Sequence, residues 1–240
     1  ANTATGIHLN YTNYPTIASN VVGGNTGGTS LCGIYGVFSG GVTIKANHVG
    51  VGLDGVTAIP NSIGIYDGNN NVNTLPWVIG GPTVADRNII AGNTSHGTST
   101  SGLAKSFAMT MQNNYFGLGA DGTTVLGNGG NNITATGYTN STIKDNVSVW
   151  AGMPNLSTAY GIAMSGSGTA SSITGNFVGI TPSGVAAGNR SGGISVTAAT
   201  GLKIGGQTTG ERNIISGNSN AATTPGIILG NSADTVIEGN

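Results

Sequence analysis

Ile17-Ala-Ser-Asn20 is the first of eight related segments that recur along the chain. Each begins with an apolar residue, passes through small or polar residues, and in most copies ends in asparagine. The eight copies are Ile17-Ala-Ser-Asn20, Ile44-Lys-Ala-Asn47, Ile79-Gly-Gly-Pro82, Met111-Gln-Asn-Asn114, Ile143-Lys-Asp-Asn146, Ile173-Thr-Gly-Asn176, Ile204-Gly-Gly-Gln207 and Ile237-Glu-Gly-Asn240. A period of about thirty residues is typical of a solenoid, in which repeats stack on their neighbours. Residues 1–240 are therefore predicted to form a single repeat domain.

Two further apolar elements flank each of these segments. One lies upstream and usually pairs glycine with an aliphatic residue; the other lies downstream, as in Phe177-Val-Gly-Ile180. The upstream pairs are Gly6-Ile7, Gly33-Ile34, Gly64-Ile65, Gly102-Leu103, Asn132-Ile133, Gly161-Ile162, Gly193-Ile194 and Gly226-Ile227. Glycine disfavours helix by about 1 kcal/mol per position relative to alanine, and 44 glycines are spread through the chain. The pattern predicts an all-β, single-stranded right-handed parallel β-helix of about eight coils, each with three short strands.

The recurring asparagine has a structural interpretation in such a coil. A tight bend between two parallel sheets needs a residue at positive φ, which asparagine tolerates better than any residue except glycine. Side-chain amides at one height per coil can also form a ladder along the axis. We therefore expect a structural turn ladder rather than ligand contacts. Its predicted members are Asn20, Asn47, Asn114, Asn146, Asn176 and Asn240.

Two alternating motifs carry a family resemblance. One has the form Asn-x-x-Gly, as in Asn114-Tyr-Phe-Gly117. The other joins Ile79-Gly-Gly81 to Arg87-Asn-Ile-Ile-Ala-Gly-Asn93, and it returns four coils later at 204–218. The whole chain resembles the pectin-lyase-like right-handed β-helix repeats of long bacterial surface and secreted proteins. That resemblance implies a fold but little about function, because the scaffold hosts lyases, glycosidases, phage tailspikes, adhesins and filament subunits.

Composition excludes several classes of protein. The net charge is −1 with only seven lysines and arginines, so no basic patch is available to bind nucleic acid. No apolar run approaches the length of about 18 residues that a membrane-spanning helix needs. The single Cys32 excludes an internal disulfide framework. A surface rich in Asn, Thr, Ser and Gly and poor in charge is typical of extracellular, cell-surface or virion-surface fibres.

An acidic row is the one candidate for chemistry. Asp54 and Asp121 each lie seven residues after a recurring asparagine, and Asp86 is expected in the matching loop of coil three, beside Arg87. Aligned loops would place their carboxylates near the separation of about 5–9.5 Å found in glycosidases, or around a calcium ion. The alternative is plain turn chemistry, since Asp54-Gly55 and Asp121-Gly122 are common turn dipeptides. We favour the turn and predict no catalytic, metal or cofactor site, with calcium as the one cofactor left open.

Two remaining residue types were weighed for binding. The histidines His8, His48 and His96 fall at different phases of the repeat, so they predict no metal cluster. Aromatic residues could stack on surface glycans, although most occupy strands and are expected to pack in the core or at its rim. The aromatic candidates are Trp77, Trp150, Tyr115, Phe116 and Tyr160.

The preferred function is structural. No capping helix is readable near Ile7 or Asn240, so we expect a segment of a longer array or an assembly subunit that associates end to end or with neighbouring subunits. The sequence therefore favours a non-catalytic, extracellular structural or adhesive β-solenoid, such as a filament, stalk or surface-fibre component. The alternative is a polysaccharide lyase or glycoside hydrolase, of the phage-tailspike type among others, acting through Asp54, Asp86 and Asp121.

Overall fold

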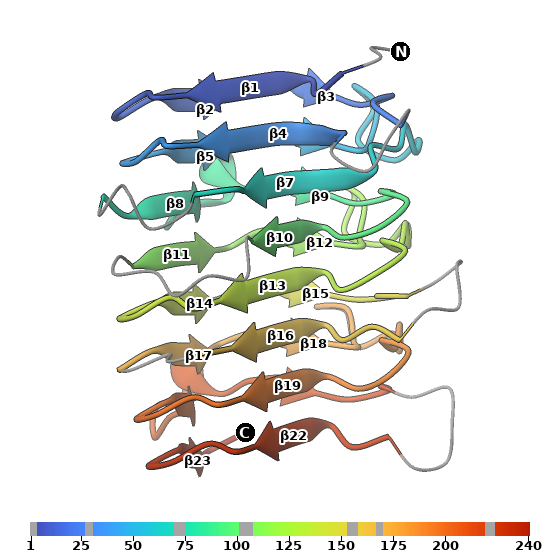
Figure 1. The fold of residues 1–240 in the computed structure, drawn as a ribbon. Helices are drawn as coiled ribbons and strands as arrows, with labels where there is room; N and C mark the ends of the chain where they lie inside the picture. The colour runs from blue at the N-terminus through green and yellow to red at the C-terminus, as the bar shows by residue number, and fades with distance from the viewer. Residues whose placement is uncertain are drawn as a thin grey trace.

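The computed structural model describes residues 4–26, 31–69, 75–100, 108–152, 158–166, 170–218 and 224–240. These residues form strands on three faces of one spiral, with two 3₁₀ turns and no α-helix among them (Figure 1). Every strand pairs in parallel with a strand of at least one neighbouring coil. The chain is thus the single-stranded right-handed parallel β-helix expected from the sequence. No helix in the described part of the chain is long and apolar enough to cross a membrane.

The first face contains two sheets of four strands each. The first sheet consists of β1 (Ile7–Asn10), β4 (Cys32–Val37), β7 (Ile63–Asp67) and β10 (Thr98–Thr100), and the second of β13 (Ile133–Thr136), β16 (Ile162–Ser165), β19 (Ile194–Thr197) and β22 (Ile227–Gly230). The first strand of coil four was predicted at Gly102-Leu103, which lie outside the described residues. The described strand of coil four on this face is β10, which begins at Thr98, directly after Gly97.

The second and third faces are continuous sheets. The second face comprises β2 (Thr16–Ala18), β5 (Thr43–Lys45), β8 (Trp77–Gly80), β11 (Met109–Gln112), β14 (Thr142–Lys144), β17 (Ser172–Thr174), β20 (Lys203–Gly205) and β23 (Val236–Glu238). The third comprises β3 (Val21–Val22), β6 (His48–Val49), β9 (Ile89–Ile90), β12 (Tyr115–Phe116), β15 (Val147–Ser148), β18 (Phe177–Val178) and β21 (Ile214–Ile215). Within the described residues seven coils have a strand on every face, and the eighth has β22 and β23 only.

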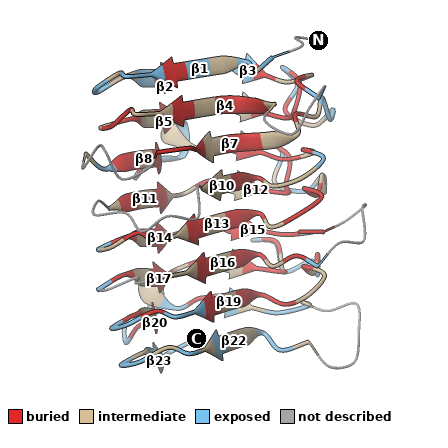
Figure 2. Ribbon diagram, in the orientation of Figure 1, coloured by how far each residue is buried: buried red, intermediate tan, exposed pale blue. Residues whose placement is uncertain are grey.

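The core is a stack of apolar side chains inside the spiral. Figure 2 shows that buried residues, coloured red, recur from coil to coil along the ribbon. Alternation along each short strand sends every second residue inward, so residues at the same phase of the repeat lie above one another. On the second face this column is Ile17, Ile44, Ile79, Met111, Ile143, Ile173 and Ile204, all of them buried. Trp77, Phe116 and Tyr138 are the largest fully buried side chains.

Three loops fold back outside the third sheet. Short antiparallel bridges join Val51 to Ala58, Leu118 to Val125 and Ile180 to Ala186, in coils two, four and six. The loops cover apolar residues on the outer side of the third sheet, and this produces two small clusters separate from the main core. The loops of coils two, four and six therefore shield the outer side of the third sheet from solvent. Alternation along the strands would by itself leave that side exposed.

Candidate functional site

The recurring asparagines form a continuous ladder at the corner between the second and third faces. Each side-chain Nδ2 donates to the Oδ1 of the asparagine in the next coil, over 2.7–3.1 Å. The ladder runs Asn20, Asn47, Asn88, Asn114, Asn146, Asn176, Asn213 and Asn240. The six residues named from the sequence all belong to it. Backbone carbonyls also accept from these amides, so polar groups that are buried at the bend are paired.

The structure adds two members to the predicted ladder and corrects its backbone conformation. Pro82 and Gln207 are not members, because the Ile-Gly-Gly coils insert the 3₁₀ turns η1 (Val84–Asp86) and η2 (Thr209–Glu211) before the bend is complete. Asn88 and Asn213 take their places, and the signal was the Arg-Asn dipeptide after each turn. Nor do the asparagines hold the positive φ. In the six coils without a 3₁₀ turn, that conformation falls on the residue before the asparagine, as at Ser19 (φ 60°) and Ala46 (φ 56°).

A second asparagine ladder, which sequence reasoning missed, follows the third face. It runs Asn25, Asn61, Asn93, Asn128, Asn132, Asn189 and Asn218, with amide-to-amide distances of 2.7–3.4 Å. A glycine lies beside the amide in most coils. A Cβ added to Gly33 would come within 2.8 Å of the Asn61 Nδ2, and one on Gly161 within 2.6 Å of the Asn189 Nδ2. The recurring Gly-Ile pair was therefore a signal for this ladder.

Asp54 and Asp121 occupy equivalent turns in the loops of coils two and four. Asp54 accepts from the backbone N–H groups of Val56 and Thr57 and from the Thr57 hydroxyl. Asp121 accepts in the same way from Thr123 and Thr124. The two loops touch, since the Ala120 N–H donates to the Gly55 carbonyl over 3.0 Å. Each carboxylate is thus used to close its own turn.

Asp86 lies at a different corner, so the expected three-residue row does not exist. It ends η1, between the second and third faces, where it accepts from the Thr83 hydroxyl at 2.7 Å and pairs with Lys45 at 3.2 Å. Arg87 points to the next coil, with its Nε donating to the Asn113 carbonyl and its guanidinium 3.9 Å from the centroid of the Tyr115 ring. Residue counting from the recurring segment could not reveal that a 3₁₀ turn is inserted after β8. Because of this insertion, Asp86 lies at an earlier corner of its coil than Asp54 and Asp121 do in theirs.

The electrostatics of these carboxylates oppose acid catalysis. Hydrogen bonds from Thr57 lower the pKa of Asp54, and those from Thr124 and Thr123 lower the pKa of Asp121 further. Hydrogen bonds from Thr83 and Lys45 lower the pKa of Asp86. A general acid in a glycosidase needs a raised pKa so that it carries a proton near neutral pH. Within the described residues, no three His, Cys, Asp or Glu side chains are grouped so as to hold a metal ion.

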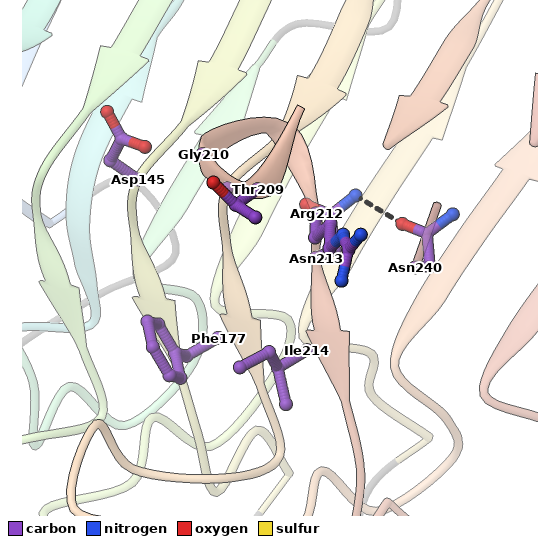
Figure 3. Close-up of a pocket in the computed structure, with 9 residues that line it drawn as sticks. Asp145, Phe177, Thr209, Gly210, Arg212, Asn213, Ile214 and Asn240 are labelled. Atoms are coloured by element: carbon purple, nitrogen blue, oxygen red, sulfur yellow. Dashed lines mark hydrogen bonds between the residues drawn. The ribbon is translucent and has the colours of Figure 1, made fainter. Parts of the chain in front are cut away.

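A groove with a volume of about 560 Å³ lies beside η2 (Figure 3). Asp145, Phe177, Arg212 and Ile214 line it together with Asn240. In coil three the equivalent arginine, Arg87, is covered by the Tyr115 ring of the following coil. In the repeat pattern, the groove is therefore the place of the residue that follows the ladder asparagine of a following coil, as Tyr115 follows Asn114.

The aromatic candidates are mostly not on the surface. Trp77 and Phe116 are fully buried in the core, while Tyr115 lies under Arg87 and Trp150 is 38% exposed. A cluster of stacked rings, exposed or partly exposed, lies on the first three coils. Tyr35 stacks between His8 and Tyr66, with centroids 5.0 and 5.4 Å apart, and Tyr11 stacks on Phe38 at 4.6 Å. The sequence could have predicted this cluster, because His8, Tyr35 and Tyr66 hold the same outward-facing position on β1, β4 and β7. Tyr11 and Phe38 follow at the adjoining corner.

Comparison with protein-family models and with curated proteins gives no match. Among solved structures, the chain is similar to the enzymatically active domain of tailspike protein 2 of bacteriophage CBA120. The two share 13% sequence identity with a TM-score of 0.49. The alignment covers 97% of this chain and 39% of the tailspike chain, so this chain spans well under half of the tailspike's length.

Proposed function

We propose that this chain is a non-catalytic structural β-solenoid of an extracellular filament, stalk or surface fibre. The observation that carries the proposal is the engagement of its carboxylates in the scaffold. Asp54, Asp86 and Asp121 close turns, and three others bond to lysine or glutamine on the second face. These three are Asp145, Glu211 and Glu238. Such groups have the chemistry of turns and ion pairs, not of a convergent acid–base pair.

The internal bonding supports a rod. Two asparagine ladders run parallel to the axis, and each rung satisfies buried polar groups that would otherwise cost about 1–3 kcal/mol each. Neighbouring coils at a strand spacing of about 4.8 Å give length in proportion to coil number. A charge-poor surface rich in small polar residues agrees with a location outside the cell, on a cell or virion surface.

The proposed partners are further coils, from the same chain or from neighbouring subunits. Asn25 supports this, because its Oδ1 is buried at the first coil and has no hydrogen-bond partner among the described residues. In the coils below, the same atom accepts from the asparagine above. An added coil with an amide at this phase would complete the ladder. The adhesive form of the proposal assigns glycan contact to the exposed rings of Tyr11 and Tyr14, which are 74% and 69% exposed.

One experiment separates this function from the enzymatic alternative. The purified chain is incubated with a panel of bacterial surface polysaccharides and plant pectins, and new reducing ends and unsaturated products are measured. The matched control is the Asp54→Asn, Asp121→Asn double variant. We expect no product from either protein, and electron microscopy should show rods. Cleavage by the parent chain that the double variant loses would overturn the proposal.

A further inference from the structure

The sheet on the first face is interrupted between coils four and five. β1, β4, β7 and β10 form one sheet, and β13, β16, β19 and β22 form another, although β10 and β13 lie next to each other (Figure 1). Backbone bonds are present where the two strands begin, from the Gly97 N–H to the Asn131 carbonyl and from the Thr98 N–H to the Asn132 carbonyl. Beyond that point, the printed bonds between β13 and β10 run from backbone N–H groups to side-chain hydroxyls.

Threonine hydroxyls replace carbonyl acceptors along the rest of this joint. The Thr134 N–H donates to the Thr98 Oγ1 and the Thr136 N–H donates to the Thr100 Oγ1, both over 3.2 Å. One coil further on, β13 and β16 pair in regular parallel register over four residues. A side-chain acceptor must have its rotamer fixed to keep the bond, so the bond is easier to lose than a rung of a backbone ladder.

The second asparagine ladder is irregular at the same joint. Ala151 occupies the ladder position of coil five, and Asn132 supplies the amide from the start of that coil instead. The rung that crosses the joint, from Asn128 to Asn132, is 2.8 Å long, and the next rung, from Asn132 to Asn189, lengthens to 3.4 Å. A further side-chain bond crosses the joint from the Tyr138 hydroxyl to Asp67, which lies two coils above.

The other two faces are unbroken here. β11 pairs with β14 on the second face, and β12 pairs with β15 on the third. The first ladder also crosses the joint normally, through the 3.0 Å bond from Asn114 to Asn146. The structure therefore has one weak face and two intact faces at a single level.

We propose that the joint between coils four and five is the yield point of the solenoid. The first face opens there before any other part of the stack, and the second and third faces act as the hinge. Opening divides the molecule into two four-coil halves, each of which keeps its own continuous sheet on the first face. This inference concerns the folded solenoid, and it stands whether or not the chain serves as a stalk.

Native-state hydrogen exchange of the 240-residue chain, resolved to single amides, tests the proposal. The amides of Thr134 and Thr136 are compared with those of Ala163 and Ser165, which hold the same phase one coil further on. We expect the threonine amides to exchange at least about tenfold faster, by an opening smaller than global unfolding. Equal protection at the two levels would overturn the proposal.

A pair of variants provides the second measurement. Thr98→Val with Thr100→Val removes both hydroxyl acceptors, while Thr110→Val with Thr142→Val changes two paired threonines on the outer side of the intact second face. The first double variant should accelerate exchange at Thr134 and Thr136 by a further factor of about ten and leave the second face unchanged. An equal effect of the control pair on the first face would contradict a local joint. If the first pair fails to fold, the parent's exchange pattern alone decides.

Discussion

Asn132 and Ala151 have exchanged the roles that glycine and asparagine hold in the other complete coils. In those coils a glycine starts the strand on the first face, and the asparagine that ends the coil fills the space beside it. The pairs are Gly6 with Asn25, Gly33 with Asn61, Gly64 with Asn93, Gly97 with Asn128, Gly161 with Asn189 and Gly193 with Asn218. In coil five the amide comes from Asn132 at the start of the strand, and its Nδ2 donates to the Val149 carbonyl at 2.7 Å. The position at the end of the coil, which holds asparagine elsewhere, is occupied by the smaller Ala151.

This exchange predicts strong coupling between the two positions. Asn132→Gly should destabilise the chain by about 1–3 kcal/mol, because the Val149 carbonyl and the Asn128 amide lose their partner. Ala151→Asn should cost a similar amount, since the new side chain meets that of Asn132 in a filled space. The double variant restores the pattern of the other coils and should recover most of the loss. Chemical denaturation of all four proteins gives the coupling energy, and additive effects would refute the exchange.

The corrected membership of the first ladder makes a separate prediction. Asn88 is buried and bonds to Asn114 and to the Ile44 carbonyl, whereas Pro82 is exposed. Asn88→Ala should therefore lower the free energy of unfolding by about 2 kcal/mol, the cost of leaving buried polar groups unpaired. Pro82→Ala, the matched control in the same coil, should change it by less than about 0.5 kcal/mol. Equal losses would contradict the assignment of Asn88 to the ladder.

The fold was readable from the sequence because its cause is local and repeated. An apolar residue such as Ile44 or Ile173 at a constant phase forces the same inward column in every coil, and glycine excludes helix. The sequence did not predict the position within the coil of residues that follow an insertion. η1 adds a turn between Ile79 and Asn88, and with it Asp86 moved to another corner. The pairing of a glycine with an asparagine, such as Gly33 with Asn61, joins residues far apart in the sequence. The recurring motifs therefore do not reveal it.

The turn of Asp121 should contribute stability only above acidic pH. Hydrogen bonds from the Thr124 hydroxyl and from the backbone of Thr123 and Thr124 lower its pKa in the folded chain. An unfolded aspartate has a pKa of about 3.9, so the contribution is fully present above that value and is lost as pH falls through the folded pKa. The Tm of the parent should exceed that of Asp121→Asn above about pH 5, and the difference should shrink below about pH 3. A difference that does not change with pH would show that the charge has no part in the turn.

Arg87 and Arg212 hold the same position in coils three and seven but differ in what surrounds them. The Arg87 guanidinium donates to the Asn113 Oδ1 at 2.6 Å and stacks on Tyr115, an arrangement that lysine cannot reproduce. Arg212 is exposed beside the groove, and the described residues include no aromatic ring that covers it. Arg87→Lys should therefore cost about 1 kcal/mol, the combined effect of the stacking and the bidentate geometry. Arg212→Lys should be nearly neutral in the 240-residue chain. Thermal and chemical denaturation of the two variants side by side measures this, and an equal cost at both positions would mean that the coil below contributes nothing to the arginine's stabilising effect.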